Sequence, residues 1–302
     1  MKYSLGLVTL VFFLMGCNGD QSVDSFTHIH GLEYEVNGEG FYIATHHGII
    51  LADQANWNLI GGTSEQHDFM GFTILENGNM ISSGHPSLQS DLNNPLGVIM
   101  SEDKGLTWEP IALHGEVDFH IIHVNAKNQN IIYGLDSYHS QLYKSENGGF
   151  NWLPIEISQA PMDIGEIYAI TSNPLDANHL LAGFPTGMFS SRDGGETWIE
   201  LEKEFTVTSF TSVNGHSEEM IAYLMGSKQG LYYSKDFGET WELIHSEFGD
   251  EAEVVIEISQ HPRNPEQLVV ATSMTNIYET HNFGQEWIMI AQEGKRVENK
   301  VN

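Results

Sequence analysis

Short runs of apolar residues, broken by Gly, Asn, Asp and Pro, follow one another along most of the chain. Examples are "EIYAITSNP" (166–174), "HLLAGFP" (179–185) and "GMFSSRD" (187–193). Such runs are typical of β-strands joined by tight turns, whereas an amphipathic helix repeats its apolar residues every three to four positions. No segment sustains that helical period. The pattern therefore predicts an all-β fold built from many short strands.

A short motif recurs between these runs. Its five clear copies are "SEDKGLTW" (101–108), "SENGGFNW" (145–152), "SRDGGETW" (191–198), "SKDFGETW" (234–241) and "THNFGQEW" (280–287). A degenerate sixth copy, "LADQANW" (51–57), precedes them, and the six tryptophans of the chain each close one copy. Successive tryptophans are 51, 44, 46, 43 and 46 residues apart. This is the period of a four-stranded propeller blade.

The repeated segments resemble the Asp box, Ser-x-Asp-x-Gly-x-Thr-Trp, of sialidases, the sortilin ectodomain and related β-propellers. The resemblance implies a six-bladed β-propeller over residues 26–292, followed by a polar tail at 293–302. Asp, Asn and Gly suit a tight turn, and a tryptophan can pack between neighbouring sheets. We therefore interpret Asp103, Asp193 and Asp236 as structural residues.

The amino-terminal segment "MKYSLGLVTLVFFLMGC" has the features of a targeting signal. Lys2 is followed by an apolar run that is too short to span a bilayer. Residues 14–17, Leu-Met-Gly-Cys, resemble the lipobox of bacterial lipoproteins. The resemblance implies a signal peptide at 1–16, a lipid on Cys17 and a tether at 17–25. We expect a protein anchored at the outer face of the bacterial cytoplasmic membrane; an ordinary secretory signal is the alternative.

The charge balance excludes some partners. The chain has 12 basic and 41 acidic residues, a formal net charge of −29. Such a surface repels nucleic acid and anionic lipid headgroups, so we expect no nucleic-acid partner and membrane contact only through the lipid. We expect a monomer.

Histidines gather in the first half of the chain, beginning with "HIHGLEYEVNGEGFYIATHHG" (28–48). In the Asp-box family, the face opposite the boxes carries the starts of the innermost strands and the loops between second and third strands. We align 28–34, 68–74, 118–124 and 166–172 as inner strands, with 206–212 and 254–260 as weaker matches. Alternation then places His30, Met70, His120 and Tyr168 at one level of the central funnel. Asp136 and His139 belong to a loop of the same face.

The clustered imidazoles have three interpretations: a polar lining, a transition-metal site for Cu or Zn, or an acid–base site acting on a bound substrate. The candidate metal ligands are His28, His30, His46, His47, His67, His85, His120 and Met70. The candidate catalytic carboxylates are Asp68, Asp118 and Glu166, and all three are expected one level above His30 in the funnel.

Sialidases bind the substrate carboxylate through three arginines. The arginines of this chain, Arg192, Arg263 and Arg296, fall outside the predicted funnel, so we expect no sialidase activity. The chain also resembles bacterial Asp-box lipoproteins labelled as glycosyl hydrolases or sortilin-like proteins, but a shared repeat carries no mechanism. We expect a funnel that binds a metal ion, a small molecule or a glycan. A glycoside hydrolase and a non-catalytic protein-interaction scaffold are the alternatives.

Overall fold

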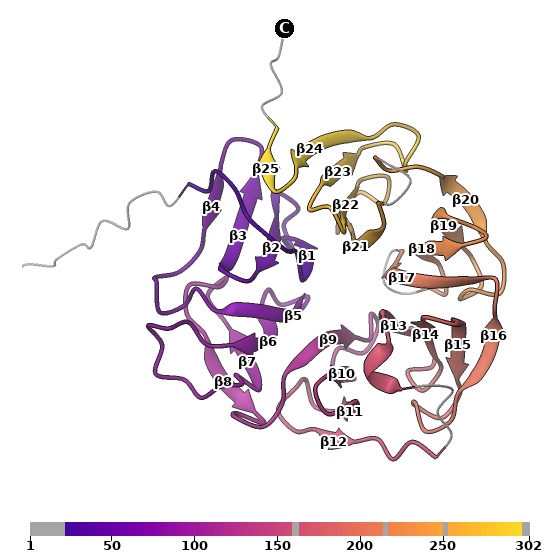
Figure 1. The fold of residues 1–302 in the computed structure, drawn as a ribbon, viewed down its shortest axis with the longest axis horizontal. Helices are drawn as coiled ribbons and strands as arrows, with labels where there is room; N and C mark the ends of the chain where they lie inside the picture. The colour runs from indigo at the N-terminus through magenta and orange to yellow at the C-terminus, as the bar shows by residue number, and fades with distance from the viewer. Residues whose placement is uncertain (1–21, 159–162, 214–216, 250–252, 298–302) are drawn as a thin grey trace, which may run out of the picture.

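The structure, a computed structural model, describes residues 22–158, 163–213, 217–249 and 253–297. Six antiparallel sheets surround a central axis, as Figure 1 shows. The predicted all-β, six-bladed propeller is confirmed. The predicted signal peptide and Cys17 lie outside the described residues, and no described helix is long and apolar enough to cross a membrane.

Each blade is built from four consecutive strands, ordered from the axis to the rim. Blades 1 to 3 contain β1 (Gly31–Tyr34), β2 (Gly40–Thr45), β3 (Gly48–Asp53), β4 (Trp57–Leu59); β5 (Asp68–Ile74), β6 (Met80–His85), β7 (Val98–Ser101), β8 (Glu109–Ala112); β9 (Phe119–Val124), β10 (Ile132–Asp136), β11 (Gln141–Ser145) and β12 (Leu153–Pro154). Blades 4 and 5 contain β13 (Ala169–Ser172), β14 (Leu180–Phe184), β15 (Gly187–Ser191), β16 (Ile199–Glu202); β17 (Phe205–Ser212), β18 (Met220–Gly226), β19 (Gly230–Ser234) and β20 (Glu242–His245). Blade 6 contains β21 (Val255–Gln260), β22 (Leu268–Thr272), β23 (Ile277–Thr280), β24 (Ile288–Gln292) and a fifth strand, β25 (Lys295–Arg296).

All six aligned segments supply inner strands, but those aligned at 28–34 and 166–172 begin three residues later than expected, so His28 and His30 precede β1. The strand predicted at 166–172 starts only at Ala169, because residues Ile164–Glu166 form a 3-10 turn, η1. The side chain of Asp163 accepts a hydrogen bond from the backbone N–H of Gly165 and caps this turn. Glu166 is therefore on an exposed turn and not on the inner strand.

The Asp boxes connect third and fourth strands and are held by internal hydrogen bonds. In the box of blade 4, Ser191 Oγ donates to Asp193 and also accepts from the backbone N–H of Gly195 at 2.8 Å. Asp193 accepts from the N–H and the hydroxyl of Thr197, at 2.9 and 2.6 Å. Both carboxylate oxygens are thus used within the turn, which agrees with a structural role.

Box tryptophans fill the space between neighbouring sheets. Trp198 is 3% exposed and packs with Phe184 and Ile170 in a core shared by blades 3 and 4. Four of the six tryptophans are buried, whereas Trp241 and Trp287 are partly exposed and their indole N–H groups have no partner among the described residues.

The ring closes without a blade that is shared between the two ends of the chain. Ser22 forms a β-bridge with Asn58, and the N–H of Phe26 donates to the carbonyl of Gly294 at 2.8 Å. β25 pairs with β24, and the guanidinium of Arg296 donates to the carbonyls of Gln54 and Ala55 in blade 1. Residues expected to belong to a tether and to a tail therefore join blade 6 to blade 1.

Candidate functional site

The face opposite the Asp boxes carries the starts of the inner strands and the β2–β3, β6–β7 and β10–β11 connections. In blades 1 to 3 these segments contain the histidines that the sequence singled out. The three arginines lie elsewhere: Arg192 in an Asp box, Arg263 in the β21–β22 hairpin and Arg296 at the junction of blades 6 and 1.

Three histidines of blade 1 lie together, and one of them, His46, contacts a carboxylate of blade 2. His46 Nδ1 lies 2.6 Å from Asp68 Oδ1, and His46 Nε2 lies 3.3 Å from His30 Nε2. The His28 ring centroid is 4.9 Å from that of His46 and 6.3 Å from that of His30. A carboxylate acceptor holds the proton of His46 on Nδ1, so that Nε2 presents its lone pair towards His30.

The charge state of this group follows from its surroundings. Burial, and after it the neighbouring imidazole of His46, lower the pKa of His30 to about 4. His30 is therefore neutral near pH 7 and keeps a nitrogen lone pair. Neutral imidazoles are the form that binds metal ions.

A second group lies between blades 2 and 3. Asp118 Oδ2 is 3.3 Å from His85 Nε2 and 3.1 Å from His120 Nε2. Asp118 is only 8% exposed, and its Oδ1 atom is buried with no hydrogen-bond partner among the described residues. The hydrogen bond to Asp118 raises the pKa of His120. The two imidazoles thus share one buried carboxylate.

The sequence located Asp136 and His139 on this face but did not select them as site residues. Asp136 is fully buried, and its Oδ2 atom is 2.6 Å from His139 Nδ1. Both line a cavity of about 690 Å³ together with His85, Asp118 and His120. An aspartate three residues before a histidine in a tight connection, as in "LDSYHS", is the signal that marks this pair.

Two candidate metal ligands lie apart from these groups. His67 is fully buried; its Nδ1 accepts from the backbone N–H of Ser87, and burial lowers its pKa. Met70 is buried beside a bulge in β5, where Phe69 pairs with Gly84 but Phe72 pairs with Ser82. Because of this bulge, Gly71 and not Met70 lines the central cavity next to His30 and His120.

Two of the other candidates fall at the edge of the site. His47 is exposed in the β2–β3 connection, and Glu166 is exposed on η1. Asp68 and Asp118 already accept hydrogen bonds from histidines. Within the described part of the chain, no group of three or more histidine, cysteine, aspartate or glutamate side chains is arranged to hold a metal ion. The structure brings two imidazole nitrogens, Nε2 of His30 and Nε2 of His46, within 3.3 Å of each other.

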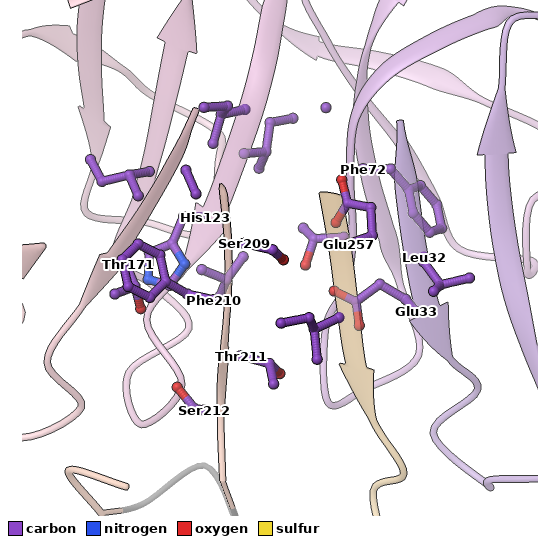
Figure 2. Close-up of a pocket in the computed structure, with 18 of the residues that line it drawn as sticks. Leu32, Glu33, Phe72, His123, Thr171, Ser209, Phe210, Thr211, Ser212 and Glu257 are labelled. Carbon is purple, nitrogen blue, oxygen red and sulfur yellow. The ribbon is translucent and has the colours of Figure 1, made fainter. Parts of the chain in front are cut away.

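The sequence did not anticipate two glutamates in the central cavity, which has a volume of about 360 Å³. Glu33 on β1 and Glu257 on β21 project into it, as Figure 2 shows. Ser259 Oγ donates to Glu33 at 3.2 Å. A charged residue in the middle of an apolar inner strand, as in "GLEY" and "VIEIS", is the signal that could have identified them.

Solved structures with a similar fold include GH74 enzymes. The GH74 enzyme of Niastella koreensis aligns with a TM-score of 0.60 and 16% identity, over 90% of this chain and 46% of that one. The GH74 xyloglucanase of Xanthomonas campestris aligns with a TM-score of 0.57 and 13% identity, over 90% and 46%. This chain thus spans about half the length of these enzymes. At such identities the likeness shows the fold alone.

A third structure, YCF48 bound to D1 peptide, aligns with a TM-score of 0.52 and 12% identity, over 89% of this chain and 82% of that one. Among curated proteins no match was found. The family model Sortilin-Vps10 (sortilin, neurotensin receptor 3) matches residues 97–225 and 186–302, more than half of the chain. Together with the Asp boxes and the six blades, this match shows that the chain belongs to the Sortilin-Vps10 family.

Proposed function

We propose that this propeller is a binding protein that holds a transition-metal ion, Zn²⁺ or Cu²⁺, between His30 and His46. The observation that carries the proposal is the 3.3 Å separation of their Nε2 atoms. Two imidazole nitrogens on a tetrahedral zinc ion, each about 2.0–2.1 Å from the metal, lie about 3.3 Å apart. Asp68 supports the arrangement, because metal-bound histidines commonly donate their second N–H to a carboxylate.

The remaining coordination positions have nearby donors. A change in the side-chain torsions of His28 would bring a third imidazole towards the pair, since its ring already lies beside that of His46. Water or a bound ligand would fill an open position. The negative charge of the protein raises the local cation concentration.

Purified, untagged protein is expected to bind one Zn²⁺ or Cu²⁺ per chain, measured by elemental analysis and titration calorimetry. Binding should weaken below about pH 6, because imidazoles must lose their protons to bind a metal. His30→Ala combined with His46→Ala should abolish binding, whereas His281→Ala, in an Asp box on the other face, should not change it. Equal binding by wild type and the double variant, or no binding at micromolar metal, would rule the proposal out.

Anchoring is part of the proposal and is supported by the sequence of residues 1–17 alone. Cys17→Ala is expected to release the protein from the membrane fraction or to leave it as an unprocessed precursor. Fractionation followed by mass spectrometry distinguishes these outcomes from the wild type. A Cys17→Ala protein of mature mass that stays in the membrane would contradict lipidation at this residue.

Glycoside hydrolysis is the second candidate. It is supported by the fold shared with GH74 enzymes and by the carboxylates Asp118 and Asp136 in one cavity. Glycosidases use two carboxyl groups on opposite sides of the scissile bond. Hydrolysis of xyloglucan by the purified protein, lost in Asp118→Asn, would favour this candidate over metal binding.

A further inference from the structure

The cavity between blades 2 and 3, of about 690 Å³, lies on the face opposite the Asp boxes and has the size of a small-molecule site. Three of its lining residues are acidic: Glu116 is exposed, whereas Asp118 and Asp136 are 8% and 0% exposed. No lysine or arginine is among the described residues that line it. The cavity is therefore acidic and has no permanent positive charge of its own.

The two buried carboxylates differ in how many partners they have. Both oxygens of Asp136 are used, because Oδ1 accepts from the backbone N–H of Tyr138 and Oδ2 lies 2.6 Å from His139 Nδ1. Asp118 places Oδ2 beside two imidazoles, but its Oδ1 has no partner among the described residues. A buried carboxylate oxygen without a donor is costly in free energy. Asp118 is therefore the carboxylate that points to a donor supplied by a ligand.

The surroundings of Asp118 suit a ligand with a positive charge and an apolar part. A hydrogen bond to this carboxylate raises the pKa of His120, so Asp118 already stabilises a positive charge. Tyr138 lines the same cavity and is 84% exposed, and its turn is fixed by the hydrogen bond from its backbone N–H to Asp136. An exposed tyrosine ring attracts cations and covers apolar groups. The net charge of −29 raises the local concentration of cations in general.

We propose that this cavity binds a small organic cation, an alkylammonium ligand, whose ammonium group donates to Asp118 and whose carbon skeleton packs against Tyr138. An ammonium group brings both the positive charge and the N–H donors that the lining lacks. Pro95, from the β6–β7 connection, adds an apolar surface to the lining. The proposal concerns the cavity named for the second candidate function, but it requires neither bond cleavage nor a bound metal ion.

The test is calorimetric titration with benzylamine at pH 8, where a primary amine is still a cation. Metal-free buffer at near-physiological salt screens the unspecific attraction to the acidic surface. Benzyl alcohol is the matched neutral probe, since a hydroxyl replaces the ammonium group. We expect the wild type to bind benzylamine about 10-fold more tightly than benzyl alcohol. Asp118→Asn should weaken benzylamine binding by about 10-fold or more, and Tyr138→Ala by about 3-fold or more.

Matched variants show whether these effects belong to the cavity. Tyr138 is exposed, so Tyr138→Ala tests the site in a folded protein even where Asp118→Asn lowers the Tm. Glu286→Gln and Phe150→Ala remove an exposed carboxylate and an exposed aromatic ring from Asp boxes. Both should leave benzylamine binding unchanged.

Two further measurements separate this site from the proposed functions. The His30→Ala and His46→Ala double variant should keep benzylamine binding, and hydrolysis of xyloglucan is assayed on its own. Failure of the histidine site, failure of the hydrolase and failure of this site are therefore distinguishable. The proposal is overturned if the wild type binds benzylamine no more tightly than benzyl alcohol, or if either Asp118→Asn or Tyr138→Ala binds benzylamine as tightly as the wild type.

Discussion

Replacing Trp198 with alanine is expected to lower the free energy of unfolding by about 3–5 kcal/mol, the usual cost of removing a large buried aromatic side chain. The indole is 3% exposed and lies in the core shared by blades 3 and 4. Its Nε1–H donates to the carbonyl of Gly195 at 3.0 Å, so the substitution also leaves a buried acceptor without its donor. Thermal unfolding should show a fall in Tm of roughly 10 °C.

Trp287→Ala is the matched control, because it removes the same side chain from the equivalent position of another box. Trp287 is partly exposed, and its indole N–H has no hydrogen-bond partner among the described residues. Its replacement should therefore cost clearly less. If both variants lose the same stability, burial between blades does not determine the contribution of the box tryptophans.

The second large effect concerns pH. In protein kept free of metal with EDTA, the combined substitutions Glu33→Gln and Glu257→Gln should raise the free energy of unfolding at pH 8. At pH 4 they should not raise it. Both carboxyls have raised pKa values in the folded chain, about 7 and about 8, against 4.5 in the unfolded chain. The folded state therefore binds more protons between pH 4.5 and 8, and these two groups lower stability as the pH rises through that range. The expected loss is on the order of a few kcal/mol, at about 1.4 kcal/mol per unit of pKa difference.

The comparison with the variants is needed because titration of His30 changes the stability in the opposite direction as the pH rises. Its pKa is lowered to about 4 from 6.5, so the unfolded chain takes up a proton first and stability falls as the pH drops through that interval. Urea unfolding at several pH values, for wild type and for the combined Glu33→Gln and Glu257→Gln variant, separates the two effects. Parallel curves for the two proteins would show that the glutamates do not titrate in the cavity.

The fold could be predicted from the sequence because each blade repeats a motif with its own local cause. The hydrogen bonds among Ser191, Asp193 and Thr197 all lie within one turn. The box can therefore be predicted from residues that are close in sequence. Strand alternation then gave the inner strands of all six blades. The prediction that His28, His30 and His46 lie near Asp68 also depended on the local strand pattern. It further required only that blades 1 and 2 are neighbours.

The details that were missed depend on local irregularities and on neighbouring blades. The bulge in β5 turns Met70 away from the cavity, and the capped turn at Asp163 removes Glu166 from its strand. Strict alternation has no means of indicating either feature. Glu33 and Glu257 come from the first and last blades, so their proximity depends on closure of the ring, which no local pattern encodes.

The way the ring closes also bears on how such a protein can change during evolution. Every sheet is made from one uninterrupted stretch of chain, and the two ends meet at the junction of blades 6 and 1 without exchanging a strand within a blade. Duplication or loss of one genetic repeat would therefore add or remove a whole sheet and divide none of the others. A ring with a blade shared between its ends would not allow this at the shared position. In this chain the inherited unit and the structural unit coincide, so the number of blades is free to vary while each blade stays intact.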